Sequence, residues 1–128
     1  MSRRMSCSMT IDAVRDRTKT VTRRHVDTWK SLKPGDRLTL IEKGMGLPKG
    51  AKQVVLAEVQ VVDVRVERLS MVHFEKFATR AEGLGHMSNA QFVRFWVESH
   101  GYKPSSNAER DATPCRRIEF RYLDEVNP

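Results

Sequence analysis

The longest β pattern in the chain changes the side on which its apolar residues lie, and this constrains the fold more than any other feature. It runs from Gln53 to Glu67. Apolar residues occupy first the odd and then the even positions: Val55, Ala57, Val59 and Val61, followed by Val62, Val64 and Val66. Strand side chains alternate with a period of two, so a switch of parity without turn residues predicts a bulge or bend between Val61 and Val62. A strand bent in this way is typical of a small, curled β-barrel.

Shorter patterns predict the other strands of the sheet. A short edge strand is expected at residues 6–9, and residues 18–24 predict a turn that leads into a basic, threonine-rich strand. Lys33-Pro34-Gly35-Asp36 has turn chemistry and precedes a strand over residues 37–43, in which Leu38 and Leu40 point inward. Residues 115–123 predict the closing strand, with Ile118, Phe120 and Tyr122 on one face.

Helices are predicted in three places. Thr10 is expected to begin a short helix over residues 11–17. Ser70 is expected to begin one over residues 71–78, with Met71, Phe74 and Phe77 or Ala78 on one face. Ser88-Asn89-Ala90-Gln91 is a capping box, and the residues after it recur at helical spacing: Phe92, Val93, Trp96, Val97 and His100. Gly101 is expected to end this helix. Residues 44–50 and 103–114 are expected to be loops.

Length and composition point to one domain. The 128 residues and 14.7 kDa match the usual size of a single domain, assigned here to residues 1–128. Hydrophobic residues make up 39% of the chain, enough for a packed core. The predicted class is α+β: a small β-barrel of about five to six strands, with two or three helices covering an opening.

Several functional classes are disfavoured. No apolar run approaches the roughly 20 residues of a membrane span, and residues 1–9 are basic without the apolar stretch of a secretory signal, so a cytoplasmic protein is expected. Cys7 and Cys115 lie far apart without metal-ligand spacing, and both are expected to be free thiols. His73, His86 and His100 also lack such spacing. Neither a metal nor another cofactor is predicted.

The net charge of +7 favours an anionic partner, with nucleic acid first. Residues 15–25 carry five cations, one acid and three threonines, the composition of a phosphate-binding edge. A solvated basic edge strand would have the same composition. Trp29 and Tyr102 are candidates for stacking on a base, although packing at a barrel mouth is the commoner role for such rings. The predicted nucleic-acid-binding residues are Arg15, Arg17, Lys19, Arg23, Arg24, His25 and Trp29.

The run Thr18-Lys19-Thr20-Val21-Thr22-Arg23-Arg24, followed by Pro34-Gly35-Asp36-Arg37-Leu38, resembles the signature of the ASCH superfamily. Lys19, Thr22 and Arg24 fall on its three key positions. Residues 117–123 resemble its closing strand, and Glu82-Gly83, Met87-Ser88 and Phe92-Val93 resemble the helical insert of small bacterial and phage-encoded members. The resemblance spans about residues 6 to 123. Arg17 stands where the family has a glycine, which puts the shape of this turn in question.

The resemblance implies a PUA-like barrel, a fold used for RNA binding. One branch of the superfamily is an amidohydrolase that removes the acetyl group from acetylcytidine, and by likeness to it the catalytic residues would be Lys19, Thr22 and Glu82. On an ideal strand Lys19 and Thr22 would point to opposite faces. The trio therefore requires Lys19 to belong to the turn before the strand.

Three hypotheses follow. The first is a module whose basic cleft binds RNA, single-stranded nucleic acid or a nucleobase. The second is an amidohydrolase acting on a modified nucleoside such as acetylcytidine. The third is a phage-type protein that binds a host protein through its exposed helices. The sequence leaves the natural ligand and the oligomeric state open.

Overall fold

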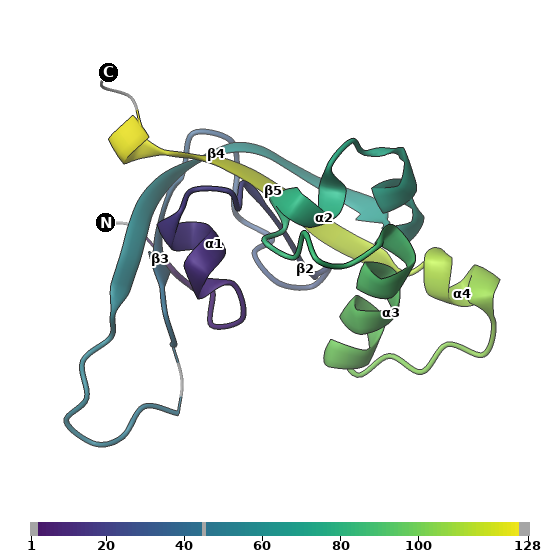
Figure 1. The fold of residues 1–128 in the computed structure, drawn as a ribbon, viewed down its shortest axis with the longest axis horizontal. Helices are drawn as coiled ribbons and strands as arrows, with labels where there is room; N and C mark the ends of the chain where they lie inside the picture. The colour runs from purple at the N-terminus through teal and green to yellow at the C-terminus, as the bar shows by residue number, and fades with distance from the viewer. Residues whose placement is uncertain (1–2, 45, 126–128) are drawn as a thin grey trace.

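A computed structural model of the protein, which describes residues 3–44 and 46–125, contains one five-stranded mixed sheet (Figure 1). The order of its strands is β1-β3-β4-β5-β2. The strands are β1 (Arg3–Ser6), β2 (Val21–His25), β3 (Arg37–Ile41), β4 (Val55–Arg68) and β5 (Pro114–Tyr122). β1 runs parallel to β3, and the other pairs are antiparallel. The sheet curls into a half-barrel, so the predicted class, α+β with a small barrel-like sheet and a few helices, is confirmed.

The predicted bend in the long strand is confirmed. The register between β4 and β5 shifts between Val61 and Asp63. Before the shift, Val59 and Val61 point into the core; after it, Val64 packs against that core. Asp63, Arg65 and Glu67 now face the other way. The bulge therefore keeps an apolar residue, Val64, on the core side of β4 and turns the charged residues to the opposite side.

The helices match the prediction in part. The capping box at Ser88 is present, and it begins α3 (Asn89–Ser99), whose inner face is apolar as predicted. Gly101 follows with a φ of +75°, which suits the end of a helix. The other helices are short: α1 (Ile11–Arg15), α2 (Ala78–Ala81) and α4 (Asn107–Asp111). α4 lies in the segment that was expected to be a loop. None of the helices in residues 3–44 and 46–125 is long and apolar enough to cross a membrane.

The prediction of a single helix over residues 71–78 is wrong. The chain forms a 3₁₀ helix, η1 (Leu69–Phe74). The helical conformation is then interrupted, and α2 begins at Ala78. Phe77 adopts a left-handed φ of 59°, which cannot continue a helix. Phe74 and Phe77, which the pattern placed on one face of a single helix, are exposed at 81% and 69% of their surface.

Two other boundaries differ from the prediction. The edge strand is β1, at residues 3–6 rather than 6–9, and α1 ends at Arg15, two residues early. Arg17 then takes a φ of 68°. A left-handed residue is most often a glycine, so the turn here keeps a conformation that glycine favours although arginine occupies it. A final 3₁₀ turn, η2 (Leu123–Glu125), follows β5.

Buried apolar side chains form two clusters. The first lies in the curl of the sheet and includes Met5, Leu38, Val59 and Tyr122. The second packs α3 and η1 against the end of the sheet and includes Leu69, Phe92, Trp96 and Cys115. Cys7 belongs to the first cluster and Cys115 to the second, and both are free thiols.

Stability at alkaline pH should depend on Cys115. Burial raises the pKa of its thiol from 9.0 to about 12. Between these values the unfolded chain has released the proton that the folded chain retains, so stability falls as the pH rises. The free energy of unfolding of the wild type, measured in urea from pH 8 to 11, should fall more steeply than that of Cys115→Ala, by about 1.4 kcal/mol per pH unit above pH 9. Equal slopes would contradict this assignment.

Candidate active site between the two cores

The turn before β2 is held from three directions. The backbone N–H of Lys19 donates to the carbonyl of Ala13 at 3.1 Å, and that of Thr20 donates to the carbonyl of Ala81 at 2.8 Å. The hydroxyl of Tyr122 donates to the carbonyl of Lys19 at 2.6 Å. Because β2 begins only at Val21, Lys19 belongs to the turn, which is the arrangement that lets its side chain and that of Thr22 converge.

Glu82, more than sixty residues further along the chain, lies beside Lys19. It ends α2, and the next residue, Gly83, has a φ of +85°. A β-carbon at Gly83 would lie 2.9 Å from Cβ of Ala13, so glycine allows this loop to pass directly over α1. The ammonium of Lys19 donates to the backbone carbonyl of Glu82 at 2.5 Å and lies 3.9 Å from its carboxylate oxygen Oε1.

Lys19, Thr22 and Glu82 line one cavity of about 290 Å³ between the two apolar clusters. Their exposed fractions are only 3%, 4% and 4%. The other walls contain Cys7, Arg24 and the rings of Phe92, Phe95, Trp96 and His100. The site thus combines a few polar groups with aromatic walls, which is the usual make-up of a small-molecule pocket.

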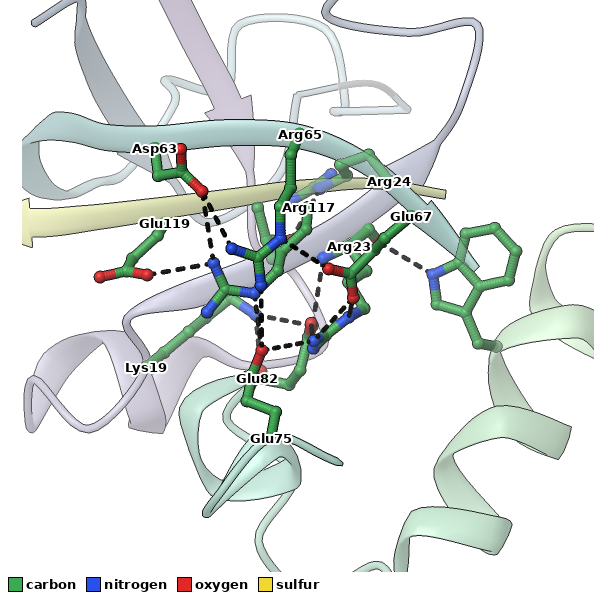
Figure 2. A network of polar contacts seen from close by, with 12 residues as sticks. Lys19, Arg23, Arg24, Asp63, Arg65, Glu67, Glu75, Glu82, Arg117 and Glu119 are labelled. Atoms are coloured by element: carbon green, nitrogen blue, oxygen red, sulfur yellow. Dashed lines mark hydrogen bonds and ion pairs between the residues drawn. The ribbon is translucent and has the colours of Figure 1, made fainter. Parts of the chain in front are cut away.

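Arg23 also lines this cavity. Its side chain lies in a network of ion pairs (Figure 2). Its guanidinium is wholly buried and contacts three carboxylates: Glu82 at 2.8 Å, Glu75 at 2.9 Å and Glu67 at 3.3 Å. Its backbone N–H also donates to Oε1 of Glu82 at 3.3 Å. Arg23 therefore holds the carboxylate of Glu82 through both its side chain and its backbone.

Burial changes the acid–base behaviour of Lys19. Desolvation of the ammonium lowers its pKa from the ordinary value, and the nearby carboxylate of Glu82 opposes only part of this effect. The carboxylate of Glu82 is itself occupied by the guanidinium of Arg23. Lys19 is therefore a better proton acceptor at neutral pH than an exposed lysine.

The cations predicted to bind phosphate do not form one continuous edge. Arg15 is exposed and lies 3.6 Å from the carboxylate of Glu42. Arg17 pairs with Asp124 and stacks over the ring of Tyr122. Along β2, Arg24 shares its parity with Thr22, and Arg23 points the other way, because strand side chains alternate. Arg23 thus faces carboxylates and not solvent, contrary to the exposed role that its composition suggested.

Arg24, His25 and Trp29 also have definite partners. Arg24 donates to the hydroxyl of Thr22 at 2.9 Å and to the carbonyl of Ser6 at 2.8 Å, which links β2 to β1 across the open side of the half-barrel. His25 contacts the hydroxyl of Tyr102 at 3.0 Å and stacks on its ring. Trp29 packs against the first apolar cluster beneath Arg3. Neither His25 nor Trp29 lines the cavity.

Sequence reasoning missed the aromatic wall and the acids of the network. Trp96 is buried, as its helical spacing predicted, but its ring nitrogen also donates to the carbonyl of Arg23 at 2.9 Å. His100 stacks on Trp96 with ring centres 3.9 Å apart. Helical spacing had predicted that both rings lie on one face of this helix, but not that this face lines the cavity. Nothing in the sequence could have placed Glu67 and Glu75 beside Arg23, since that depends on the register of the sheet and on the break before α2.

Among the described residues, His, Cys, Asp and Glu side chains form no group of three that could hold a metal ion. The polar groups that line the cavity include an amine, a hydroxyl, a carboxylate and guanidinium groups.

Solved structures with this fold exist. The chain is similar to hypothetical protein PH0355, with 20% identity, a TM-score of 0.59 and coverage of 96% of this chain and 100% of that one. Protein PF0455 from Pyrococcus furiosus has 17% identity, a TM-score of 0.53 and coverage of 97% and 99%. Protein EF3133 from Enterococcus faecalis V583, described with the family DUF984, has 18% identity, a TM-score of 0.56 and coverage of 89% and 69%. At these identities the likeness shows the fold alone. No family model matches the chain, and no curated protein matches it.

Proposed function

We propose that the cavity binds a nucleobase, presented as a free base or as a nucleoside. The observation that carries the proposal is the convergence of Lys19, Thr22 and Glu82 in one buried cavity whose remaining walls include the aromatic rings of α3. A flat ring can pack against such walls while a few polar groups select its edge.

The three polar groups offer complementary chemistry to a base edge. The carboxylate of Glu82 accepts hydrogen bonds from an amino group or ring N–H, and the ammonium of Lys19 donates to a carbonyl oxygen. The hydroxyl of Thr22 accepts from Arg24 and keeps its own proton to donate. The half-barrel fold fits a binding module, and the resemblance of the segment containing Lys19, Thr22 and Arg24 to the ASCH signature supports a base as the ligand.

Calorimetric titration with the four common ribonucleosides and their bases tests this proposal. At least one should bind the wild type, and Glu82→Gln should weaken binding at least about tenfold, because a hydrogen bond to a charged group is lost. Glu98→Gln, the same change at an exposed position on α3, should leave binding unaltered.

Two outcomes would count against base binding in this cavity. One is the absence of binding by every base and nucleoside. The other is binding that Glu82→Gln does not weaken. A single-stranded RNA that binds when nucleosides do not, with an affinity that falls steeply as salt rises, would assign the protein to backbone recognition instead.

A second function, hydrolysis of an acylated nucleoside, is favoured by the lowered pKa of buried Lys19 beside Thr22 and Glu82. Lys19 in its amine form would take the proton of the Thr22 hydroxyl as the oxygen attacks the acyl carbonyl carbon. The C–N bond then breaks, and the proton passes from Lys19 to the leaving amine. Water next cleaves the acyl–threonine ester and releases the carboxylic acid. Glu82 would orient both Lys19 and the amino group of the substrate.

Incubation with acetylcytidine tests this second function. Cytidine and acetate should appear in equal amounts, as followed by chromatography, and Thr22→Val should abolish their release because it lacks the attacking hydroxyl. Product formation that persists in Thr22→Val would exclude threonine as the nucleophile.

A further inference from the structure

The ion-pair network beneath the cavity carries no surplus of positive charge. Ion pairs within 4.0 Å join four cations, Lys19, Arg23, Arg65 and Arg117, to five carboxylates, Asp63, Glu67, Glu75, Glu82 and Glu119. Figure 2 shows these groups converging from the strands β2, β4 and β5 and from the segment around η1 and α2. Adding Arg24, which lines the cavity, brings the two signs into balance.

The remaining titratable groups of the cavity add no charge at neutral pH. Burial raises the pKa of the Cys7 thiol above its ordinary value, so the thiol keeps its proton. Burial also lowers the pKa of His100, so its ring is neutral at pH 7.

The cations that line the cavity are Lys19, Arg23 and Arg24, and the carboxylate that lines it is Glu82. Glu67 and Glu75 contact Arg23 from outside the lining and bring the two signs into balance. A phosphate placed in this cavity would therefore meet the carboxylate of Glu82 without any excess cation to offset it.

From this balance we propose that the cavity selects an uncharged ligand, a nucleoside or base without phosphate, and that Glu67 and Glu75 are the residues that impose this choice. The proposal rests on the function proposed above and narrows its ligand class. Neither carboxylate lines the cavity. Both act through Arg23, whose guanidinium they neutralise from the side away from the cavity, at 3.3 Å and 2.9 Å.

The position of Glu75 allows a direct test. It accepts from Nε of Arg117 at 2.7 Å as well as from Arg23, and it is partly exposed, at 19%. In Glu75→Gln the amide oxygen can still accept from both arginines, so the substitution removes a charge while it keeps the shape. The cavity then gains one unit of positive charge relative to the wild type.

The experiment compares a nucleoside with its 5′-monophosphate by calorimetric titration. The wild type should bind the nucleoside at least about tenfold more tightly. In Glu75→Gln this preference should shrink by about tenfold, whereas the exposed control Glu98→Gln should keep the wild-type preference. Asp63→Asn, at a residue that is 42% exposed, provides a second and milder variant that should shift the preference in the same direction.

A second arm needs no nucleoside. The melting temperature is measured in sodium sulfate and in sodium chloride of equal ionic strength. Sulfate raises the melting temperature of all three proteins because it is excluded from protein surfaces. The increase should be larger for Glu75→Gln than for the wild type or Glu98→Gln, because only this variant gains a site for the anion.

The outcomes separate this inference from the proposed function. If the wild type binds the monophosphate as tightly as the nucleoside, the selection of uncharged ligands is overturned while base binding stands. If Glu75→Gln behaves like Glu98→Gln in both arms, the role of Glu75 is overturned. If no variant binds either compound but sulfate still stabilises Glu75→Gln more than it stabilises the wild type, base binding fails and the charge balance stands.

Discussion

Replacement of Arg23 by methionine should destabilise the protein by about 3–5 kcal/mol, more than any other single change to the charged network. Methionine fills much of the same volume, but it leaves the carboxylates of Glu67, Glu75 and Glu82 without the guanidinium that they share. Of these, Glu67 and Glu82 are almost wholly buried, at 6% and 5% exposed, so their charges cannot be met by solvent. Urea unfolding at pH 7 measures the loss.

Arg15→Met is the matched control for this prediction. The side chain of Arg15 is 56% exposed and its guanidinium lies 3.6 Å from the carboxylate of Glu42, so the same substitution there should cost at most about 1 kcal/mol. Arg23→Met should also recover part of its stability when the pH is lowered, because protonation of the carboxylates removes the unpaired charges. A loss below 1 kcal/mol for Arg23→Met would mean that the network contributes little to the fold.

Replacement of Lys19 by methionine should separate function from stability. Removal of the amine should lower turnover of acetylcytidine at least about 100-fold, the usual contribution of a positioned acid–base group. The free energy of unfolding should stay unchanged or rise, because burial disfavours the ammonium, as its lowered pKa shows, and Glu82 keeps its contact with Arg23. Chromatographic rates and urea unfolding on the same preparation measure the two effects.

Arg24→Met tests whether any loss of a cation near the cavity has the same effect. Arg24 bonds to Thr22 and Ser6 and is not placed beside Glu82, so its loss should lower turnover less than the loss of Lys19 and should lower stability as well. If Lys19→Met were as unstable as Arg23→Met, Lys19 would be a structural partner of Glu82 and not a residue maintained for function.

Local patterns predicted most of the elements because their causes lie close together in the chain. The parity switch at Val61 and Val62 predicted the bulge, and the Ser88 capping box predicted the start of α3. The helix predicted at residues 71–78 was wrong for a reason that local spacing cannot show. Glu75, within that segment, forms ion pairs with Arg23 and Arg117 from distant strands. The left-handed backbone of Phe77 then interrupts the helical conformation.

The sequence singled out three residues of the candidate site, but it did not predict which charged groups surround them. Lys19, Thr22 and Glu82 were singled out by resemblance, and the structure places them around one cavity. Arg23 was grouped with the phosphate-binding cations because its neighbours in sequence are basic. Its actual neighbours are carboxylates from β4 and from the segments before and after α2, which a count of charges along the chain cannot reveal.

Alternation of side chains and the chemistry of caps act over short stretches of this chain, and they predicted the bend of the long strand and the capped helix. The turn that carries Lys19 is held by contacts from Ala81 and Tyr122, which are distant in sequence. The pairing of charges was decided only when β4, β5 and β2 came into register and the loop at Gly83 packed on α1. Electrostatic energy depends on distance in space and on burial, neither of which is set by separation along the sequence. For that reason a chain with a net charge of +7 encloses a cavity whose lining cations are balanced by carboxylates, two of which, Glu67 and Glu75, lie outside the lining and contact Arg23.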